Sequence, residues 1–506
     1  MFSYEDLKDF FKNQNLKVIV AADAETRVSK IKNGKEVLII PAGGVAVALD
    51  PLACASNAVY IARGKTEEER KISQNGAKKV IVEDPRGNYS IKRIFTTGEE
   101  LEQYYYGFSN QTLWPLCHVA FEPPEFREDW YEGFKKVNQK FAKAIKEEIK
   151  GKSFVWINDY QLSLVPKYLG RQKDTIIGMF WHIPWPTWEI FRILPQKKEI
   201  LESLLMCDFI AFHRGYQARN FLDTIEREFE ARIDQETSKV YFNKNVTLVK
   251  NLPMGIDTQT LEAVLEEKKQ DGLFGKVIRG VMQINNENDI TKRFDTLFKK
   301  NKVILGVDRL DYTKGLKLRL LALEKFFEKN KNYIGKVTYL GIIAPSREKI
   351  PSYYVLVKEV RRLEKKINQK FQNKALGDWK PINIVYEVFA RNEVLNLYKR
   401  ANVCLVTPLD DGMNLVSKEF VIAASYSDDP GMLVLSQFAG SSIDLTRAII
   451  INPYNVEEVS NAIKKALEMD KKEKIEKISA MKKTLEERNS YEWASQFVQN
   501  AVGAKE

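Results

Sequence analysis

The chain has 506 residues and is 44% hydrophobic, with 79 basic and 68 acidic side chains that give a net charge of +11. This length suits two domains, and the composition is that of a folded globular protein, which excludes a disordered chain. The lysine clusters lie among glutamates, so they indicate solvated helix faces and not a nucleic-acid-binding surface. A basic balance suits anionic small substrates equally well.

The cysteines and the apolar runs argue against a cysteine metal site, a membrane protein and a secreted protein. Cys54, Cys117, Cys207 and Cys404 are far apart and without the spacing of a metal site, so we expect reduced core residues. No apolar run reaches the ~18 residues of a membrane helix, and the first residues do not resemble a secretory signal. The sequence therefore predicts a soluble, cytoplasmic protein with no membrane or nucleic-acid partner and no required metal. A homo-oligomer is left open.

Short apolar runs alternate with amphipathic stretches, a pattern typical of βα units around a parallel sheet. In the first half we predict strands at residues 16–21, 36–41, 154–157, 176–181 and 209–212, and a long helix at 124–150. The apolar side chains of this helix recur every three or four residues, so we interpret them as core.

The pattern changes near residue 255, where a polar helical stretch runs to about residue 300. New βα units follow, with strands predicted at 303–307, 337–343, 382–386, 403–407, 432–435 and 448–451. We predict domains at 1–255 and 256–485, and a C-terminal helix at 486–506. The fold class is α/β, with two doubly wound domains that face each other across a cleft. Ligands are expected at the carboxyl ends of the strands.

Two strand–turn–helix segments in the second half carry the clearest chemistry. Arg309-Leu-Asp-Tyr-Thr-Lys-Gly-Leu316 places Arg309 and Lys314 at a turn whose N–H groups and helix end can meet a diphosphate. About a hundred residues later, Asp411-Gly-Met-Asn-Leu-Val-Ser-Lys-Glu419 repeats the arrangement. There Asp411 can accept sugar hydroxyls, the amides of Gly412 to Leu415 can meet phosphates, and Glu419 can accept ribose hydroxyls. Each turn alone is weak evidence for a ligand site, but the two together indicate a binding site for a sugar nucleotide.

Polar and aromatic residues follow other predicted strands. Asp159 could accept a sugar hydroxyl or cap a helix. His182, one of three histidines, stands before two prolines that fix its turn, which favours a functional role. The aromatic segment 104–114 could be core or a wall for a sugar. Arg347 could clamp an acceptor phosphate or make a surface salt bridge.

Taken in order, these segments resemble trehalose-6-phosphate synthases, the retaining glycosyltransferases of family 20, with two Rossmann-like domains (the GT-B fold). The matching stretches are Gly43-Gly44 and residues 105–114, 155–162, 177–195, 307–316, 344–347, 407–419 and 435–454. The resemblance implies a C-terminal helix that returns to the first domain. That domain would bind the acceptor, and the second the nucleotide sugar.

The resemblance also implies roles for individual residues. On the donor side, Arg309 and Lys314 would hold the diphosphate, Glu419 the ribose, and Asp411, His182, Gly412, Met413, Asn414 and Leu415 the glucose and its phosphates, while Gly44 would let a loop approach. On the acceptor side, Asp159 would contact the hydroxyls, and Tyr105, Trp114 and Arg347 the phosphate.

The implied reaction is glucosyl transfer from a nucleotide glucose, first of all UDP-glucose, to glucose 6-phosphate. The product would be α,α-trehalose 6-phosphate, and no cofactor would be required. The leaving phosphate would take the acceptor's proton. Catalysis would therefore rest on Arg309, Lys314, His182 and Asp159 as positioning and stabilising groups, without a covalent nucleophile.

The chain departs from the family mainly on the acceptor side. The usual Asn-Arg pair after the first strand is missing from Ala21-Ala-Asp-Ala-Glu-Thr-Arg27, where Arg27 is a candidate substitute. The family's Trp-Val-Gly-Trp segment is replaced by Val59-Tyr-Ile-Ala62, and its His-Asp-Tyr-His segment by Asn158-Asp-Tyr-Gln161. Asp410 stands where the family usually has an arginine. Two alternatives stay open. One is a relative with another phosphorylated acceptor, such as glycerol 3-phosphate, or a pseudoglycosyltransferase that joins cyclitols. The other is a non-catalytic sugar-phosphate sensor.

Overall fold

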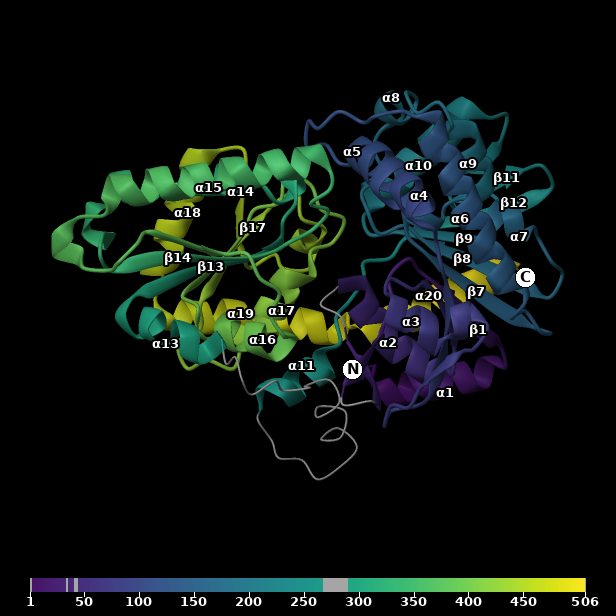
Figure 1. Ribbon diagram of the computed structural model, residues 1–506, viewed down its shortest axis with the longest axis horizontal. Helices are drawn as coiled ribbons and strands as arrows, with labels where there is room; N and C mark the ends of the chain where they lie inside the picture. The colour runs from purple at the N-terminus through teal and green to yellow at the C-terminus, as the bar shows by residue number, and fades with distance from the viewer. Residues whose placement is uncertain (1, 33–34, 41–43, 267–289, 506) are drawn as a thin grey trace. The chain divides into compact units, whose positions relative to one another are not determined.

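The computed structural model describes residues 2–32, 35–40, 44–266 and 290–505 (Figure 1). The chain forms two compact units. Unit 1 comprises Met1–Asp257 with Asn489–Glu506, and unit 2 comprises Thr258–Arg488. Gly43 and most of the helical stretch predicted before residue 300 lie outside the described residues.

Unit 1 is built on a sheet with the strand order β10-β11-β12-β9-β8-β7-β1-β4-β6-β5. The run from β12 to β6 is parallel, and the remaining pairs are antiparallel. In chain order the strands are β1 (Lys17–Ala21), β4 (Val59–Arg63), β5 (Val80–Val82), β6 (Tyr89–Ile94), β7 (Ser153–Asn158), β8 (Thr175–Phe180), β9 (Phe209–Phe212), β10 (Arg232–Asp234), β11 (Lys239–Phe242) and β12 (Asn245–Asn251). The strand order therefore reverses between β1 and β7, which is where doubly wound sheets bind ligands.

The strand predicted at 36–41 corresponds to β3 (Lys35–Ile39), but it does not belong to this sheet. It pairs in an antiparallel hairpin with β2 (Val28–Lys32). An apolar run of this length does not reveal its partner, because a short hairpin strand and a sheet strand have the same residue preferences.

The helices of unit 1 follow from their apolar faces. They are α1 (Tyr4–Gln14), α2 (Gly44–Ser56), α3 (Glu67–Ile72), α4 (Gly98–Leu101), the π-helix η2 (Glu102–Leu113), α5 (Trp114–Cys117), α6 (Glu128–Lys146), α7 (Val165–Leu169), α8 (Trp188–Phe191), α9 (Lys197–Leu204), α10 (Gly215–Glu228) and α20 (Ser490–Lys505). Helix α6 is the helix predicted at 124–150, and it buries the expected stripe, which includes Phe134 and Phe141.

The C-terminal helix α20 packs on the sheet of unit 1, as the resemblance implied. The ring of Phe497 stacks on Trp156 of β7 with centroids 4.1 Å apart, and Trp493 lies 5.2 Å from the same ring. Figure 1 shows this helix in yellow against the strands of unit 1. Aromatic burial of this size anchors the end of the chain to the unit in which the chain begins.

Unit 2 contains a six-stranded parallel sheet in the described residues, with the order β15-β14-β13-β16-β17-β18. Its strands are β13 (Lys302–Arg309), β14 (Val337–Ala344), β15 (Ile382–Val385), β16 (Val403–Val406), β17 (Met432–Ser436) and β18 (Ile449–Ile451), so the six predicted strands are confirmed to within two residues. Numbered along the chain, this is the 3-2-1-4-5-6 order of a Rossmann fold. The order reverses between β13 and β16.

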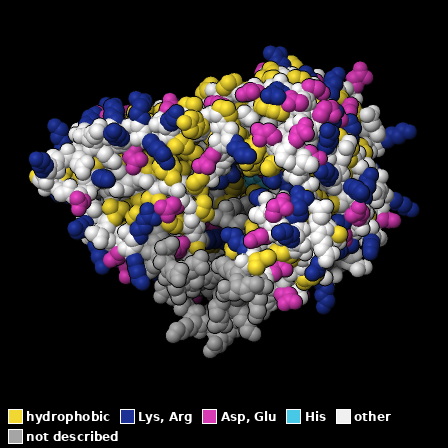
Figure 2. All heavy atoms as spheres, in the orientation of Figure 1, with side chains coloured by type: hydrophobic (Ala, Val, Ile, Leu, Met, Phe, Trp, Pro, Cys, Tyr) yellow, Lys and Arg dark blue, Asp and Glu magenta, His cyan; other side chains and the backbone are white. Residues whose placement is uncertain are grey.

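Helices cover both faces of this sheet (Figure 1). Helices α14 (Leu316–Lys329), α15 (Pro351–Phe371) and α18 (Val456–Glu468) lie on one face, and α13 (Ile290–Lys300), α16 (Arg391–Arg400), α17 (Leu415–Ala424) and α19 (Lys471–Glu487) on the other. Helix α11 (Thr258–Leu265) begins the unit. Among the described helices of either unit, none is long and apolar enough to cross a membrane. Basic and acidic side chains are interspersed over the face that Figure 2 shows.

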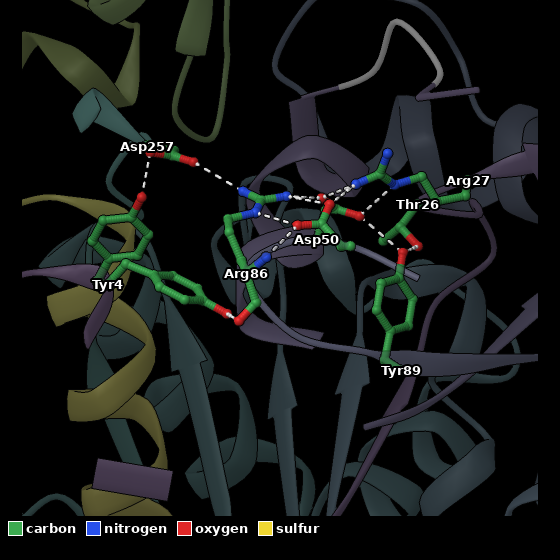
Figure 3. Close-up of polar contacts among 9 residues, drawn as sticks. Tyr4, Thr26, Arg27, Asp50, Arg86, Tyr89 and Asp257 are labelled. Carbon is green, nitrogen blue, oxygen red and sulfur yellow. Dashed lines mark hydrogen bonds and ion pairs between the residues drawn. The ribbon is translucent and has the colours of Figure 1, made fainter. Parts of the chain in front are cut away.

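A buried ion-pair network holds the loop after β1 (Figure 3). Arg27 donates from Nε and Nη2 to both carboxylate oxygens of Asp50, at 2.8 and 2.9 Å, and from Nη2 to Asp84 at 2.7 Å. Arg86 reaches Asp50 at 2.7 Å, and Tyr89 donates to it at 2.8 Å. Arg27 is therefore part of the core of unit 1. These partners were not indicated by the sequence, and the role of Arg27 as a substitute for the family's phosphate-binding arginine stays a prediction.

The substitution Asp50→Asn is expected to lower the free energy of unfolding by about 3–5 kcal/mol, because it removes one of the two carboxylates that the buried guanidinium groups of Arg27 and Arg86 share and leaves Asp84 alone between them. Urea denaturation followed by tryptophan fluorescence reports this, since every tryptophan except Trp379 belongs to unit 1. Asp9→Asn, at an exposed position of α1, is the control and should change stability by no more than about 0.5 kcal/mol. A loss equal to that of the control would contradict the structural role of Asp50.

Candidate active site

The first of the two turns predicted to bind the donor, residues 309–316 (the first donor turn), leaves the end of β13 in unit 2. Asp311 caps the short helix η4 (Tyr312–Lys314) by accepting hydrogen bonds from the N–H and hydroxyl of Thr313, at 3.0 and 2.9 Å. Gly315 has φ +66°, and a Cβ there would lie 2.3 Å from the carbonyl oxygen of Thr407, so no other residue fits. Helix α14 begins directly afterwards. The turn thus aims a helix N-terminus beside exposed Arg309 and half-buried Lys314.

The second donor turn leaves β16 and is fixed from its own side chains. Asn414 has φ +79° and caps α17, because its side chain accepts a hydrogen bond from the N–H of Ser417 at 3.0 Å. The N–H of Gly440 donates to the carbonyl of Asp411 at 3.0 Å, and that of Ser441 donates to Met413 at 2.6 Å. These bonds hold the backbone of residues 411–414, whose amides were predicted to meet phosphates.

The two turns meet at the reversal of strand order. Lys314 donates from Nζ to Oδ2 of Asp411 at 2.6 Å, and Asn414 donates to the same oxygen at 3.1 Å. The N–H of Leu409 also donates to the carbonyl of Thr313, at 2.7 Å. Three of the predicted donor residues therefore come together from segments about a hundred residues apart.

Arg319 supports both turns from below and was missed by the sequence analysis. Its guanidinium donates to Asp308 at 2.6 Å, to Thr407 at 2.8 Å and to the carbonyl of Lys314 at 3.3 Å, and its side chain is only 1% exposed. The available signal was an arginine on the face of α14 that otherwise buries leucines. A buried charge at such a position requires a partner and often fixes a loop.

Glu419 and Arg347 have partners that the sequence did not indicate. Glu419, on α17, accepts hydrogen bonds from Nε and Nη2 of Arg391 at 3.1 and 2.7 Å. Arg347 has φ +52° and is only 9% exposed, with its guanidinium on Tyr353 at 2.6 Å and on Asp311 at 3.3 Å. The alternative of a surface salt bridge for Arg347 is therefore wrong. Its role toward an acceptor phosphate stays a prediction.

In unit 1, Asp159 and His182 follow the neighbouring strands β7 and β8. Asp159 has φ +73°, and its Oδ1 accepts hydrogen bonds from the N–H groups of Tyr160, at 3.0 Å, and His182, at 3.1 Å. The carboxylate thus ties two strand ends together and also caps the short helix η3 (Tyr160–Leu162). Capping does not exclude the predicted contact with a sugar hydroxyl, since a carboxylate accepts several hydrogen bonds.

The environment of His182 keeps its ring neutral. Its burial, together with the neighbouring His213, holds the pKa of His182 well below the usual value. Nε2 lies 3.1 Å from Oδ1 of Asn158 and so carries the proton, while Nδ1 has no hydrogen-bond partner among the described residues. A neutral imidazole of this kind can accept a hydrogen bond from a hydroxyl, but it is a poor proton acceptor near neutral pH.

The aromatic segment forms the π-helix η2, in which two side-chain amides stabilise the wide turns. Asn110 donates to the carbonyl of Tyr105 at 2.7 Å, and Gln111 donates to that of Tyr106 at 3.0 Å. Tyr160 in turn donates to Oδ1 of Asn110 at 2.8 Å. π-Helical segments are rare in proteins, and those that occur are often found at functional sites.

Trp114 begins helix α5 directly after η2. Its ring lies 5.9 Å from that of Tyr160 and 4.1 Å from that of His118. Through Tyr160 and Asn110, the structure therefore brings Tyr105, Trp114 and Asp159 into one cluster. Gly44 is exposed at the start of α2.

Asp50, Cys54 and Asp84 are the group of potential metal ligands that the described residues bring within 4.8 Å of one another. Both carboxylates already bind the guanidinium groups of Arg27 and Arg86. Burial raises the pKa of the Cys54 thiol well above its usual value, which disfavours the thiolate that a metal requires. This group does not fit a metal.

Comparison with known proteins identifies the family. The family model described as glycosyltransferase family 20 matches residues 15–502. The chain belongs to glycosyltransferase family 20. It is 34% identical to the UDP-forming α,α-trehalose-phosphate synthase of Pichia angusta, over 84% of this chain and 86% of that protein. With the corresponding enzyme of Candida albicans it shares 30% identity, over 95% of this chain and 96% of that protein. The match to synthase A of Dictyostelium discoideum, at 31% identity, covers 95% of this chain but only 62% of that protein.

Solved structures of the family have the same fold. The trehalose-6-phosphate synthase OtsA superposes with a TM-score of 0.81 at 26% identity, over 96% of this chain and 99% of that chain. A Burkholderia xenovorans synthase in complex with glucose-6-phosphate superposes with a TM-score of 0.81 at 25% identity, over 96% of this chain and 100% of that chain. The family 20 chain therefore has the GT-B fold that the sequence predicted.

The neutral state of His182 gives a prediction for pH dependence. Because the folded protein resists protonation at this site, the unfolded chain binds the additional proton, and stability is lost as the pH falls below about 6.5, by up to about 1.4 kcal/mol per pH unit. Urea denaturation between pH 7.5 and 5 should show a smaller loss for His182→Gln than for the wild type. Equal losses in the two proteins would contradict the assignment.

Proposed function

We propose that this family 20 chain is a UDP-forming α,α-trehalose-phosphate synthase, which transfers glucose from UDP-glucose to glucose 6-phosphate with retention of configuration. The observation that carries the proposal is the contact between Lys314 and Asp411, 2.6 Å long, which joins the two donor turns where the strand order of unit 2 reverses. The names of its relatives support the same reaction.

Unit 2 holds the donor in this proposal. Arg309, Lys314 and the amides of the second turn bind the diphosphate at the N-termini of α14 and α17, where helix dipoles favour negative charge. Asp411 accepts glucose hydroxyls, and Glu419, held by Arg391, accepts ribose hydroxyls. OtsA bound with UDP-2-fluoro glucose is a structural relative of this chain, at 27% identity and a TM-score of 0.79, which supports a uridine nucleotide sugar as the donor.

Unit 1 holds the acceptor. Asp159 and neutral His182 meet sugar hydroxyls, while Tyr105 and Trp114 meet the phosphate side. The bond between C1 of glucose and the diphosphate oxygen breaks, and the acceptor hydroxyl forms its new bond to C1 on the same face. The acceptor proton moves to the diphosphate oxygen, so no side chain needs to act as a base. The reaction transfers one glucosyl group and one proton, and we propose no cofactor for it.

A second candidate function is transfer to a different phosphorylated acceptor, such as glycerol 3-phosphate. It is favoured by the departures from the family around the acceptor residues: Asn158 and Gln161 flank Asp159, and the segment after β1 lacks the family's arginine. The described donor residues are common to both candidates. A sensor without catalysis would bind the nucleotide sugar without releasing UDP.

The experiment that tests the proposal is UDP release from UDP-glucose, with GDP- and ADP-glucose beside it, in the presence and absence of glucose 6-phosphate. NMR of the product identifies the linkage from its anomeric signals. Release that requires glucose 6-phosphate and yields an α,α-linked product is expected. Tight binding of UDP-glucose without release in any mixture would replace the proposal by the sensor.

The substitution Arg309→Ala is expected to lower the rate of transfer by ~10²–10³-fold, the loss seen when a preorganised group that stabilises developing charge is removed. The thermal midpoint should stay unchanged, because Arg309 is exposed at a strand end. Arg362→Ala, at an exposed position of α15 in the same unit, is the matched control and should retain full activity. A folded Arg309→Ala protein with wild-type activity would remove Arg309 from the donor site.

A further inference from the structure

Two segments that depart from the family sequence are neighbours in the sheet of unit 1. The segment Ala21–Arg27 follows β1, and residues 59–62 belong to β4. These strands pair in parallel, with Ile19 opposite Val59 and Ala21 opposite Ile61. Two residues farther along, at the carboxyl edge of the sheet, the N–H of Arg63 donates to the carbonyl of Asp23 at 3.4 Å. The two departures are therefore joined by one pair of residues.

Asp23 and Arg63 form a buried two-pronged ion pair. Nε and Nη2 of Arg63 donate to the two carboxylate oxygens of Asp23 at 2.8 and 2.9 Å. The side chain of Arg63 is 5% exposed and that of Asp23 is 8% exposed. Burial works to raise the pKa of Asp23, but the charge and hydrogen bonds of Arg63 hold it below its usual value. Tyr104 donates to the same carboxylate at 3.1 Å. The guanidinium is thus fixed in one orientation.

That orientation places Arg63 against the aromatic segment. Its Cζ lies 5.1 Å from the ring centroid of Tyr105, within the range of a cation–π contact. Nε and Nη2 are engaged by Asp23, whereas Nη1 makes no hydrogen bond to a described residue. A nearly buried guanidinium therefore has one remaining donor group, and it lies beside a ring that was predicted to contact an acceptor phosphate.

The other candidate acceptor residues share this edge of the sheet. Strands β4, β1, β7 and β8 are consecutive neighbours, and all are parallel. Arg63, Asp23, Asp159 and His182 stand at or just beyond their carboxyl ends. The side chain of Asn158 donates to the carbonyl of Ala21 at 3.3 Å, which joins the ends of β7 and β1. Ligands of doubly wound sheets bind at this edge, next to the reversal of strand order.

We propose that Arg63 is a specificity-determining residue for the acceptor, which binds the acceptor's phosphate through Nη1 while Asp23 and Tyr105 hold the guanidinium in place. Arginine suits this task because its planar fork can bind one carboxylate and still present a donor to a second anion. The inference rests on the proposed function, since it assigns the phosphate end of the acceptor to a residue of unit 1.

Arg93 offers a matched control. It lies on β6, the strand next to β4, and forms the same two-pronged pair with Glu25, at 2.8 and 2.9 Å. Its Nη1 also has no partner among the described residues, so a spare donor alone does not mark a ligand site. Arg93 contacts Ser29 instead of an aromatic ring, and its side chain is fully buried. A purely structural role for Arg63 predicts that the two arginines respond alike to substitution.

The experiment compares Arg63→Met, Arg63→Lys and Arg93→Met with the wild type. The readouts are the KM values for glucose 6-phosphate and UDP-glucose, the kcat/KM ratio of glucose 6-phosphate to glucose, and the Kd of glucose 6-phosphate measured by calorimetry with UDP present. Arg63→Met should raise the acceptor KM and Kd about 10–100-fold, the effect of losing a hydrogen bond to a charged group. The preference for the phosphorylated sugar should fall by a similar factor, with the KM for UDP-glucose constant within about twofold.

The controls separate the possible failures. Arg93→Met should lose thermal stability but keep the acceptor KM, and Arg63→Lys, which retains the charge without the fork, should lie between wild type and Arg63→Met. Arg63→Lys also tests the inference if Arg63→Met does not fold. Unchanged acceptor binding in a folded Arg63 variant, or equal effects of Arg63→Met and Arg93→Met, would overturn the inference.

Failure of the proposed function has a different signature. A wild-type protein that binds glucose 6-phosphate without turnover removes the synthase activity, yet the Kd comparison still tests Arg63. If glucose 6-phosphate does not bind, the same comparison is made with glycerol 3-phosphate, and absence of binding by both phosphates overturns the inference.

Discussion

A charge removed from water must be paired, and this constraint fixes the loops on which the candidate site depends. In unit 2, Asp308 with Arg319 holds the carbonyl of Lys314 in the first donor turn, and Asp311 with Arg347 holds the start of the same turn. In unit 1, Asp23 with Arg63 fixes the end of β1 against β4. Removal of either partner leaves an uncompensated buried charge, so these loops have a single stable arrangement. Loops held in this way can aim backbone N–H groups without reorganisation during the reaction.

The two predicted half-sites differ in what holds them. The donor turns lie at the reversal of a Rossmann sheet, and their contacts run between backbone groups and residues of the two turns themselves, as in the pair of Lys314 and Asp411. The acceptor half depends on side chains from several strands, including Asn158 and the aromatic helix η2. There the pair of Asp23 with Arg63 joins the residue two positions beyond the end of β1 to the last residue of β4.

The sequence predicted the strands of unit 2 to within two residues because parallel strands covered on both faces read as continuous apolar runs, as β14 does. In unit 1 it missed β2, β4, β5, β6, β10, β11 and β12, and it could not place β3 in a hairpin. It identified the donor turns from their local spacing, but not their supports. Arg319, Arg391 and Arg63 look like ordinary arginines, since their partners lie 11, 28 and 40 residues away. The π-helix was also beyond reach, because an apolar helical pattern does not distinguish i→i+5 from i→i+4 hydrogen bonds.

The central claim is that a family-like donor half serves an acceptor half that still selects a hexose phosphate. The most direct test is a competition, with UDP-glucose and equal concentrations of glucose 6-phosphate and glycerol 3-phosphate in one reaction, and with the two products separated and quantified. The account predicts that trehalose 6-phosphate is the dominant product. A dominant glucosylglycerol phosphate would contradict it and would transfer the function to the second acceptor, while the donor half would keep its assignment.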